Sequence, residues 1–248
     1  MAGTVAGFLL IPLLVLGGYS LLATSILPSL RRTTSIVAPL LLGATCLLVA
    51  IGLSASVGGD PLNAVQVGSP WVMVAAFVAG SVAGFVAFQL ERRLSRALIN
   101  RRASRTPVDA LPASLRGTMP GVDESFIGVA LIAQRPAVFA GITLWTATAE
   151  EVLYRGTVLL VCVPLGLDPW LALVLQATFY AGSHLAFGLP AVLGKILLGL
   201  SLGAVALVSG SILPALMVHI GYQILMWRQF RRWGKPRANV GEGARISP

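Results

Sequence analysis

The feature that most constrains this chain is a series of seven apolar stretches, each close to 20 residues long. A helix needs about 20 apolar residues to cross the hydrocarbon core of a bilayer, so each stretch predicts one span. Charged residues make up only 11% of the 248 residues, whereas soluble domains carry about 25%. The sequence therefore predicts an all-α, polytopic transmembrane helical bundle of about seven spans. The predicted spans are Gly3–Leu27, Ile36–Val57, Pro70–Leu90, Ala137–Pro164, Pro169–Phe187, Pro190–Val208 and Ser211–Trp227.

The basic residues predict how this bundle lies in the membrane. Sixteen of the eighteen Lys and Arg residues fall in connections that share one side, namely 31–35, 91–136, 188–189 and the tail from 228. The opposite connections carry only Asp60 and Asp168. Because cytoplasmic loops are enriched in Lys and Arg, we expect the N-terminus outside and the C-terminus in the cytoplasm. Basic residues confined to short runs between spans also argue against nucleic-acid binding.

The same pattern divides the chain into four parts. Residues 1–90 hold three spans, 91–136 a basic segment, 137–227 four spans, and 228–248 a basic cytoplasmic tail. The basic segment begins with Glu91–Leu98, which predicts an amphipathic helix along the anionic inner leaflet. Prolines at 107, 112 and 120 favour a cytoplasmic linker after it, with a substrate gate or regulatory arm as the alternative.

Three charged residues lie inside the fourth predicted span, where each costs about 2.5–3.5 kcal/mol at the bilayer centre. They are Glu150, Glu151 and Arg155. Glu151 and Arg155 are four residues apart, so they share a helix face and are expected to pair. Glu150 is rotated by about 100° from Glu151, and we expect it to face a different neighbour. A buried ion pair explains two of these charges and leaves Glu150 without a structural reason.

Both histidines of the chain also lie in predicted spans. His184 falls in the fifth span and His219 in the seventh, and Gln223 follows His219 one helical turn later. Helix rise places Glu150 and His219 at similar depth and His184 nearer the cytoplasm. Ionisable residues inside membrane spans rarely face the lipid, and they often belong to functional sites. We therefore predict that Glu150, His184 and His219 converge on one intramembrane site.

These residues form three ordered motifs: Glu150-Glu151-x-x-x-Arg155, Tyr180-x-x-x-His184 and His219-x-x-x-Gln223. The motifs resemble the CPBP family (CAAX protease and bacteriocin-processing, also called Abi), which includes the type II CAAX prenyl endopeptidases. The resemblance covers about residues 137–227. The family usually has Phe where this chain has Tyr180, and Asn where it has Gln223.

The resemblance implies a glutamate-dependent intramembrane endopeptidase, in a bacterial cell membrane, that acts on a peptide or membrane-protein substrate. Glu150 would activate water and His184 would help to hold it. His219 and Gln223 would stabilise the oxyanion, and Glu151 with Arg155 would brace the helix. No HExxH motif is present, which favours a site without a cofactor. Zinc held by the two histidines and Glu150 is the alternative.

Two other functions compete with the peptidase interpretation. One is a non-catalytic membrane scaffold or bacteriocin-immunity protein, because a fold does not fix an activity. The other is a proton-coupled transporter, since chains of Glu and His also relay protons. A transporter would favour inverted repeats and broken helices, and the sequence shows neither by inspection.

Overall fold

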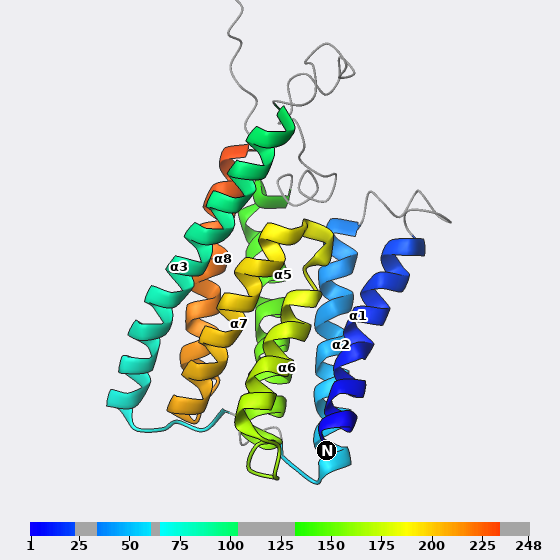
Figure 1. Cartoon of the computed structure of the whole chain (residues 1–248), viewed down its shortest axis with the longest axis vertical. Coiled ribbons are helices and arrows are strands. Elements are labelled where there is room, and N and C mark those ends of the chain that lie inside the picture. The colour runs from blue at the N-terminus through cyan, green and yellow to red at the C-terminus, as the bar shows by residue number, and fades with distance from the viewer. Residues whose placement is uncertain (23–33, 61–64, 104–131, 234–248) are drawn as a thin grey trace, which may run out of the picture.

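The computed structural model describes residues 1–22, 34–60, 65–103 and 132–233, which fold into helices joined by turns (Figure 1). No strand occurs among these residues, so the predicted all-α helical bundle is confirmed. The elements are α1 (Ala2–Leu21), α2 (Thr34–Val57), α3 (Pro70–Ala103), α5 (Pro136–Glu150), η5 (Glu151–Val161), α6 (Pro169–Gly182), η6 (Leu185–Phe187), α7 (Leu189–Ser209) and α8 (Leu213–Trp233).

Four of these helices are long and apolar enough to cross a membrane: α1, α2, the Pro70–Ala97 part of α3, and α7. The π-helix η5 follows α5 without a break, and the two make one continuous helix. The predicted C-terminal end of the span Pro169–Phe187 is wrong, because α6 ends at Gly182 after 14 residues. At 1.5 Å per residue it rises only about 21 Å, less than a bilayer core of about 30 Å. The number of spans stays a prediction.

Helix α7 occupies the middle of the bundle and packs on both α3 and α6. Glycines permit these close approaches. Gly80 and Gly84 of α3 face side chains of α7 and α8, while Gly199 of α7 lies against Ala177 of α6. On the other side of the bundle, α2 packs on α1 and α5. The long helices stand side by side in Figure 1, so residues near their middles can meet inside the protein.

The structure changes the interpretation of the segment that begins at Glu91. Helix α3 runs unbroken from Pro70 to Ala103, so Glu91–Leu98 continues the membrane helix instead of forming a separate one (Figure 1). Glu91 itself is buried, and it faces the bundle interior. The predicted linker beyond residue 103 lies outside the described residues up to 131, and so do Arg31, Arg32 and the tail from 234.

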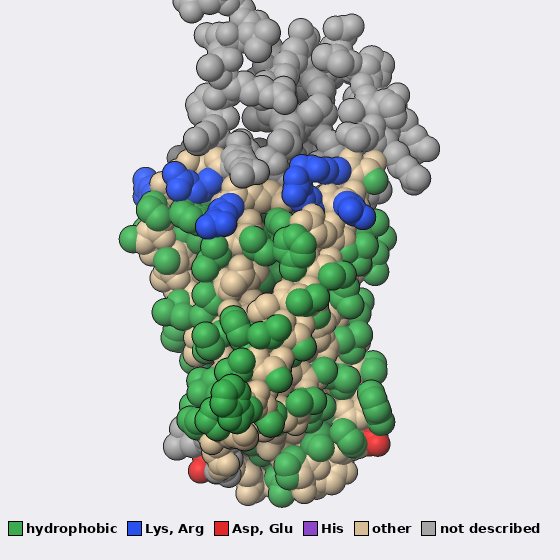
Figure 2. All heavy atoms as spheres, turned by 90° about the vertical axis from the view of Figure 1, so that its left-hand side faces the viewer, with side chains coloured by type: hydrophobic (Ala, Val, Ile, Leu, Met, Phe, Trp, Pro, Cys, Tyr) green, Lys and Arg blue, Asp and Glu red, His purple; other side chains and the backbone are tan. Residues whose placement is uncertain are grey.

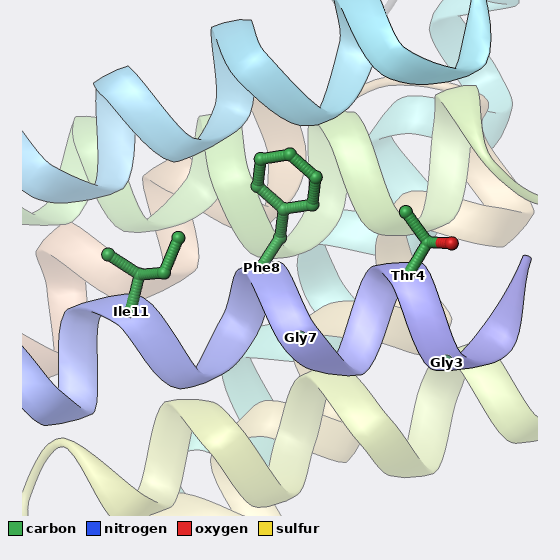
Figure 3. A pocket seen from close by; sticks show the side chains of 5 residues that line it. All are labelled: Gly3, Thr4, Gly7, Phe8 and Ile11. Carbon is green, nitrogen blue, oxygen red and sulfur yellow. The ribbon is translucent and has the colours of Figure 1, made fainter.

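The surface shows the expected separation of charge. Figure 2 shows Lys and Arg side chains gathered at one end, a hydrophobic flank, and acidic groups at the opposite end. A shallow hollow on α1 is lined by Gly3, Thr4, Gly7, Phe8 and Ile11 (Figure 3). Its side chains project towards α2, and none of them is a candidate for chemistry. The hollow therefore gives no functional site.

Candidate active site

The candidate site begins where α5 becomes η5. Glu150 is the last residue of α5 and Glu151 the first of η5, and both are almost completely buried. The η5 backbone follows a π-helical pattern, as in the hydrogen bond from the Cys162 N–H to the Thr157 carbonyl, 3.0 Å long. Turns of this kind are rare and are found frequently at functional sites. The local backbone thus marks the position of the double glutamate.

The imidazole of His219, on α8, lies between the two carboxylates. Its Nδ1 is 2.8 Å from Oε1 of Glu151, and its Nε2 is 3.7 Å from Oε2 of Glu150. The expectation that Glu150 faces a different neighbour from Glu151 is therefore wrong. An imidazole carries nitrogens on two edges, so adjacent helix positions pointing in different directions can both reach one ring. His219 is fully buried.

The ion pair between Glu151 and Arg155 indicates which nitrogen of His219 carries a proton. Arg155 donates from Nη1 to Glu151 Oε1 over 3.0 Å, which is the predicted pair four residues apart. A carboxylate held by a guanidinium is ionised and only accepts hydrogen bonds. Nδ1 of His219 therefore carries a proton and donates it to Glu151. Arg155 also lies over the ring of Tyr180, 4.6 Å from its centroid.

The opposite nitrogen of His219 faces polar groups of α6 and α8. The hydroxyl of Tyr180 lies 3.3 Å from Nε2, and the amide nitrogen of Gln223 lies 3.4 Å from it. In the neutral ring Nε2 is an acceptor, and both groups donate to it. Tyr180, which replaces the usual Phe of the resembled family, thus adds a hydroxyl to the site.

His184 is placed differently from the prediction. It lies in the turn after α6, not within a span, because the helix ends at Gly182. Its Nδ1 lies 3.0 Å from the backbone carbonyl of Tyr180 and 3.0 Å from Oγ of Ser183. The ring of Tyr180 contacts both imidazoles, with centroid distances of 5.2 Å to His184 and 5.8 Å to His219. His184 therefore borders the site across Tyr180.

An apolar groove between α5 and α8 reaches this cluster. It has a volume of about 380 Å³, and Phe139, Leu144, Ile224 and Trp227 are among its lining residues. Gln223 lines the groove too, and its amide contacts His219. The groove thus connects the flank of the bundle with the polar cluster.

A second set of buried polar residues was missed by the sequence analysis. Glu91 on α3, Lys195 on α7 and Tyr222 on α8 are all buried. Lys195 is a lysine inside the predicted span Pro190–Val208, and the cost of burying its charge was the signal that could have revealed it. The sequence analysis did not identify Glu91 as a buried residue, because Glu91 directly precedes Arg92 and Arg93 and was assigned to the basic segment.

The donors of the alternative zinc site do not assemble into a metal centre. Within the described ranges, no three His, Cys, Asp or Glu side chains are grouped so that they could hold a metal ion. Nδ1 of His219 faces Glu151 and Nδ1 of His184 faces the carbonyl of Tyr180, so Nε2 is the nitrogen of each ring that could bind a metal. It is the spacing of these side chains, and not the hydrogen bonds of the rings, that does not fit a metal ion in this structure.

A comparison with protein families finds a match for the part of the chain that contains the candidate site. Residues 132–225 match the family described as type II CAAX prenyl endopeptidase Rce1-like. This segment is similar to Rce1-like endopeptidases. It starts just before α5 and ends in α8, so it contains all three motifs. The resemblance to the CPBP family is confirmed. No curated protein and no solved structure is significantly similar to the chain.

The match to the Rce1-like family and the apolar helices together give the general character of the protein. The family is one of CAAX-type endopeptidases, and four helices have the length and composition of membrane spans. The chain is therefore a membrane protein that contains a segment similar to a family of CAAX-type endopeptidases.

Proposed function

We propose that the protein is an intramembrane endopeptidase in which Glu150 activates the hydrolytic water. One observation carries the proposal: the buried imidazole of His219 lies between two carboxylates. Its Nδ1 faces Glu151 and its Nε2 faces Glu150. Glu151 is paired with Arg155, whereas the only basic side chain within 4.0 Å of the Glu150 carboxylate among the described residues is His219, at 3.7 Å. A carboxylate without a full structural role, next to an imidazole, suits a general base.

The proposed reaction proceeds through a tetrahedral intermediate. Glu150 takes a proton from water as the water oxygen bonds to the carbonyl carbon of the peptide. The carbonyl oxygen becomes an oxyanion, and Glu150 passes the proton that it took from water to Nε2 of His219. The protonated Nε2 and the amide of Gln223 then donate hydrogen bonds to the oxyanion. Glu151 orients the ring and stabilises its cationic form, as the carboxylate of a catalytic triad does. As the C–N bond breaks, this proton passes from His219 back through Glu150 to the leaving amine, and the carbonyl re-forms. His184 helps to hold the water before it attacks.

The apolar groove between α5 and α8 is the proposed route of the substrate. Its wall consists mainly of hydrophobic side chains, and Gln223 is one of its lining residues. A peptide carried in the bilayer, or attached to it, can enter such a groove without becoming exposed to water. In this proposal residues 137–227 are the catalytic core, and the basic end of the bundle faces the anionic cytoplasmic leaflet.

Cleavage by the purified protein tests the proposal. The folded protein in detergent should cleave at least one member of a library of quenched peptides and lipopeptides, and a strong chelator should leave the rate unchanged. Loss of the rate on chelation, with recovery on adding zinc, would establish a metallopeptidase and overturn the metal-free mechanism. Absence of cleavage from folded protein would favour a scaffold or immunity protein. Solute or proton flux in liposomes would favour a transporter.

A further inference from the structure

Tyr180 brings a buried hydroxyl to the proposed active site, and the mechanism above makes no use of it. The side chain is fully buried, and its hydroxyl oxygen lies 3.3 Å from Nε2 of His219. The amide nitrogen of Gln223 lies 3.4 Å from the same atom. Tyr180 and Gln223 are also the two positions at which the motifs of this chain differ from those of the resembled family. Both differences therefore meet at one ring nitrogen, the one that takes up a proton in the proposed reaction.

The ring of Tyr180 is held in place without its hydroxyl. The guanidinium of Arg155 lies 4.6 Å from the ring centroid. The rings of Tyr154, His184 and His219 meet it edge to face, at centroid distances of 5.7, 5.2 and 5.8 Å. A phenylalanine ring would make these same contacts. Because the packing fixes the hydroxyl oxygen and leaves only its hydrogen to turn, the hydroxyl is a preorganised donor.

Protonation of His219 takes away the acceptor of this hydroxyl. In the resting ring Nε2 has a lone pair, and Tyr180 donates to it. When Nε2 carries a proton in the intermediate, it becomes a donor, and the hydroxyl hydrogen needs another acceptor. Two atoms 3.3 Å apart share positions about 2.7 Å from both, which is the length of a hydrogen bond to an anion. An oxyanion held by the protonated Nε2 is therefore within reach of the Tyr180 hydroxyl.

We propose that Tyr180 is a catalytic residue that supplies a third oxyanion donor: its hydroxyl donates to Nε2 of His219 in the resting site and to the oxyanion of the intermediate. No covalent bond is made or broken in this change, in which the hydroxyl hydrogen turns about the C–O bond. The inference rests on the proposed function. A donor that reaches the oxygen only when negative charge develops there accelerates the chemical step and contributes little to substrate binding.

A role confined to the resting site predicts the opposite result. If the hydroxyl only satisfied Nε2 of the resting ring, its loss would free this nitrogen for the proton, and kcat would stay the same or rise. If the hydroxyl donates to the oxyanion, kcat falls when it is lost. Tyr180→Phe deletes only the hydroxyl oxygen. On the library peptide that the wild type cleaves fastest, we expect its kcat to fall at least about tenfold, with KM within about twofold of the wild-type value.

Tyr154→Phe is the matched control for this substitution. Tyr154 is equally buried, and its ring centroid lies 6.0 Å from the Arg155 guanidinium. Its hydroxyl has no hydrogen-bond partner among the described residues, so its removal breaks no hydrogen bond there. We expect kcat of Tyr154→Phe to stay within about twofold of the wild-type value. Both variants are purified in the detergent used for the wild type and shown by circular dichroism to be folded.

Binding of a phosphinate analogue of the same peptide gives a second readout, because its tetrahedral anionic group mimics the intermediate. Tyr180→Phe should bind the phosphinate at least about tenfold more weakly than the wild type does. An isostere with a methylene group in place of the carbonyl should bind equally to both proteins. If Tyr180→Phe does not fold, the structure of the wild type with the phosphinate decides, and the hydroxyl oxygen should lie about 3 Å from a phosphinate oxygen.

Several results would overturn the inference. They are an unchanged or raised kcat in folded Tyr180→Phe, a change confined to KM, an equal fall of kcat in Tyr154→Phe, an unchanged affinity for the phosphinate, and a bound phosphinate whose oxygens do not contact the hydroxyl. Absence of cleavage by the folded wild type would instead refute the proposed function, and the inference with it.

Discussion

Replacement of Glu151 by Gln should destabilise the fold strongly, although the side chain keeps its shape. Glu151 is fully buried and accepts two charge-assisted hydrogen bonds, 3.0 Å from Arg155 and 2.8 Å from His219. Nε and Nη2 of Arg155 have no hydrogen-bond partner among the described residues. The guanidinium therefore depends on Glu151 and on the ring of Tyr180.

The magnitude follows from these contacts. Hydrogen bonds to charged groups contribute about 1.5–3 kcal/mol each, so the two contacts of Glu151 amount to about 3–6 kcal/mol. Removal of one member of a buried ion pair costs about 3–5 kcal/mol, because the other charge is left uncompensated. The amide oxygen of Gln can still accept both hydrogen bonds, which go to the same oxygen in the wild type, but it carries no negative charge. We therefore expect the free energy of unfolding to fall by about 3 kcal/mol.

Unfolding of the purified protein in mixed micelles, followed by helical circular dichroism as denaturing detergent is added, measures this loss. Glu150→Gln is the matched control, because the described residues place no basic group but His219 within 4.0 Å of the Glu150 carboxylate, at 3.7 Å. Its free energy of unfolding should stay within about 1 kcal/mol of the wild type. In the double variant Glu151→Gln/Arg155→Met, part of the lost stability should return. A Glu151→Gln variant as stable as the wild type would refute the assignment of Glu151 as the counter-charge of Arg155.

Further predictions concern the amide of the site and the packing of its scaffold. Gln223→Leu should lower kcat about 100-fold in a peptide cleavage assay, as loss of one oxyanion donor does, whereas Gln223→Asn should retain much of the wild-type kcat. If Gln223→Leu cleaves as fast as the wild type, Gln223 has no part in the mechanism. Gly43→Ala should cost about 1–3 kcal/mol of stability, because its Cβ would collide with the indole of Trp145, while kcat of the folded fraction stays normal. Gly17→Ala on α1, where a Cβ meets nothing within 4 Å, is the control and should not lower the unfolding midpoint.

The helices that hold the site were predictable where the membrane fixes their length. The expected span Ile36–Val57 became α2, Thr34–Val57, and Pro190–Val208 became α7, Leu189–Ser209. An apolar run between turn residues determines both ends of such a helix. The end of α6 was not predictable in this way, because apolar residues continue past Gly182 into the 3-10 turn Leu185–Phe187.

Contacts within one helix were easier to predict than contacts between helices. The Glu151–Arg155 pair follows from helical spacing alone. The insertion of His219 between the two carboxylates depends on how α8 is rotated and how closely it packs on η5, which periodicity does not specify. The Glu91–Tyr222 hydrogen bond joins residues 131 positions apart and depends on the same lateral packing.

The central claim is that Glu150 is the base of a peptidase, and the rate of Glu150→Gln tests it most directly. Wild type and variant are purified in one detergent, shown by circular dichroism to be equally folded, and compared on the peptide that the wild type cleaves fastest. The change keeps the shape of the side chain and removes only its ability to take a proton. We predict that kcat/KM falls by about 10²–10⁴-fold, the contribution of a general base. A folded Glu150→Gln protein that cleaves at the wild-type rate would contradict the account.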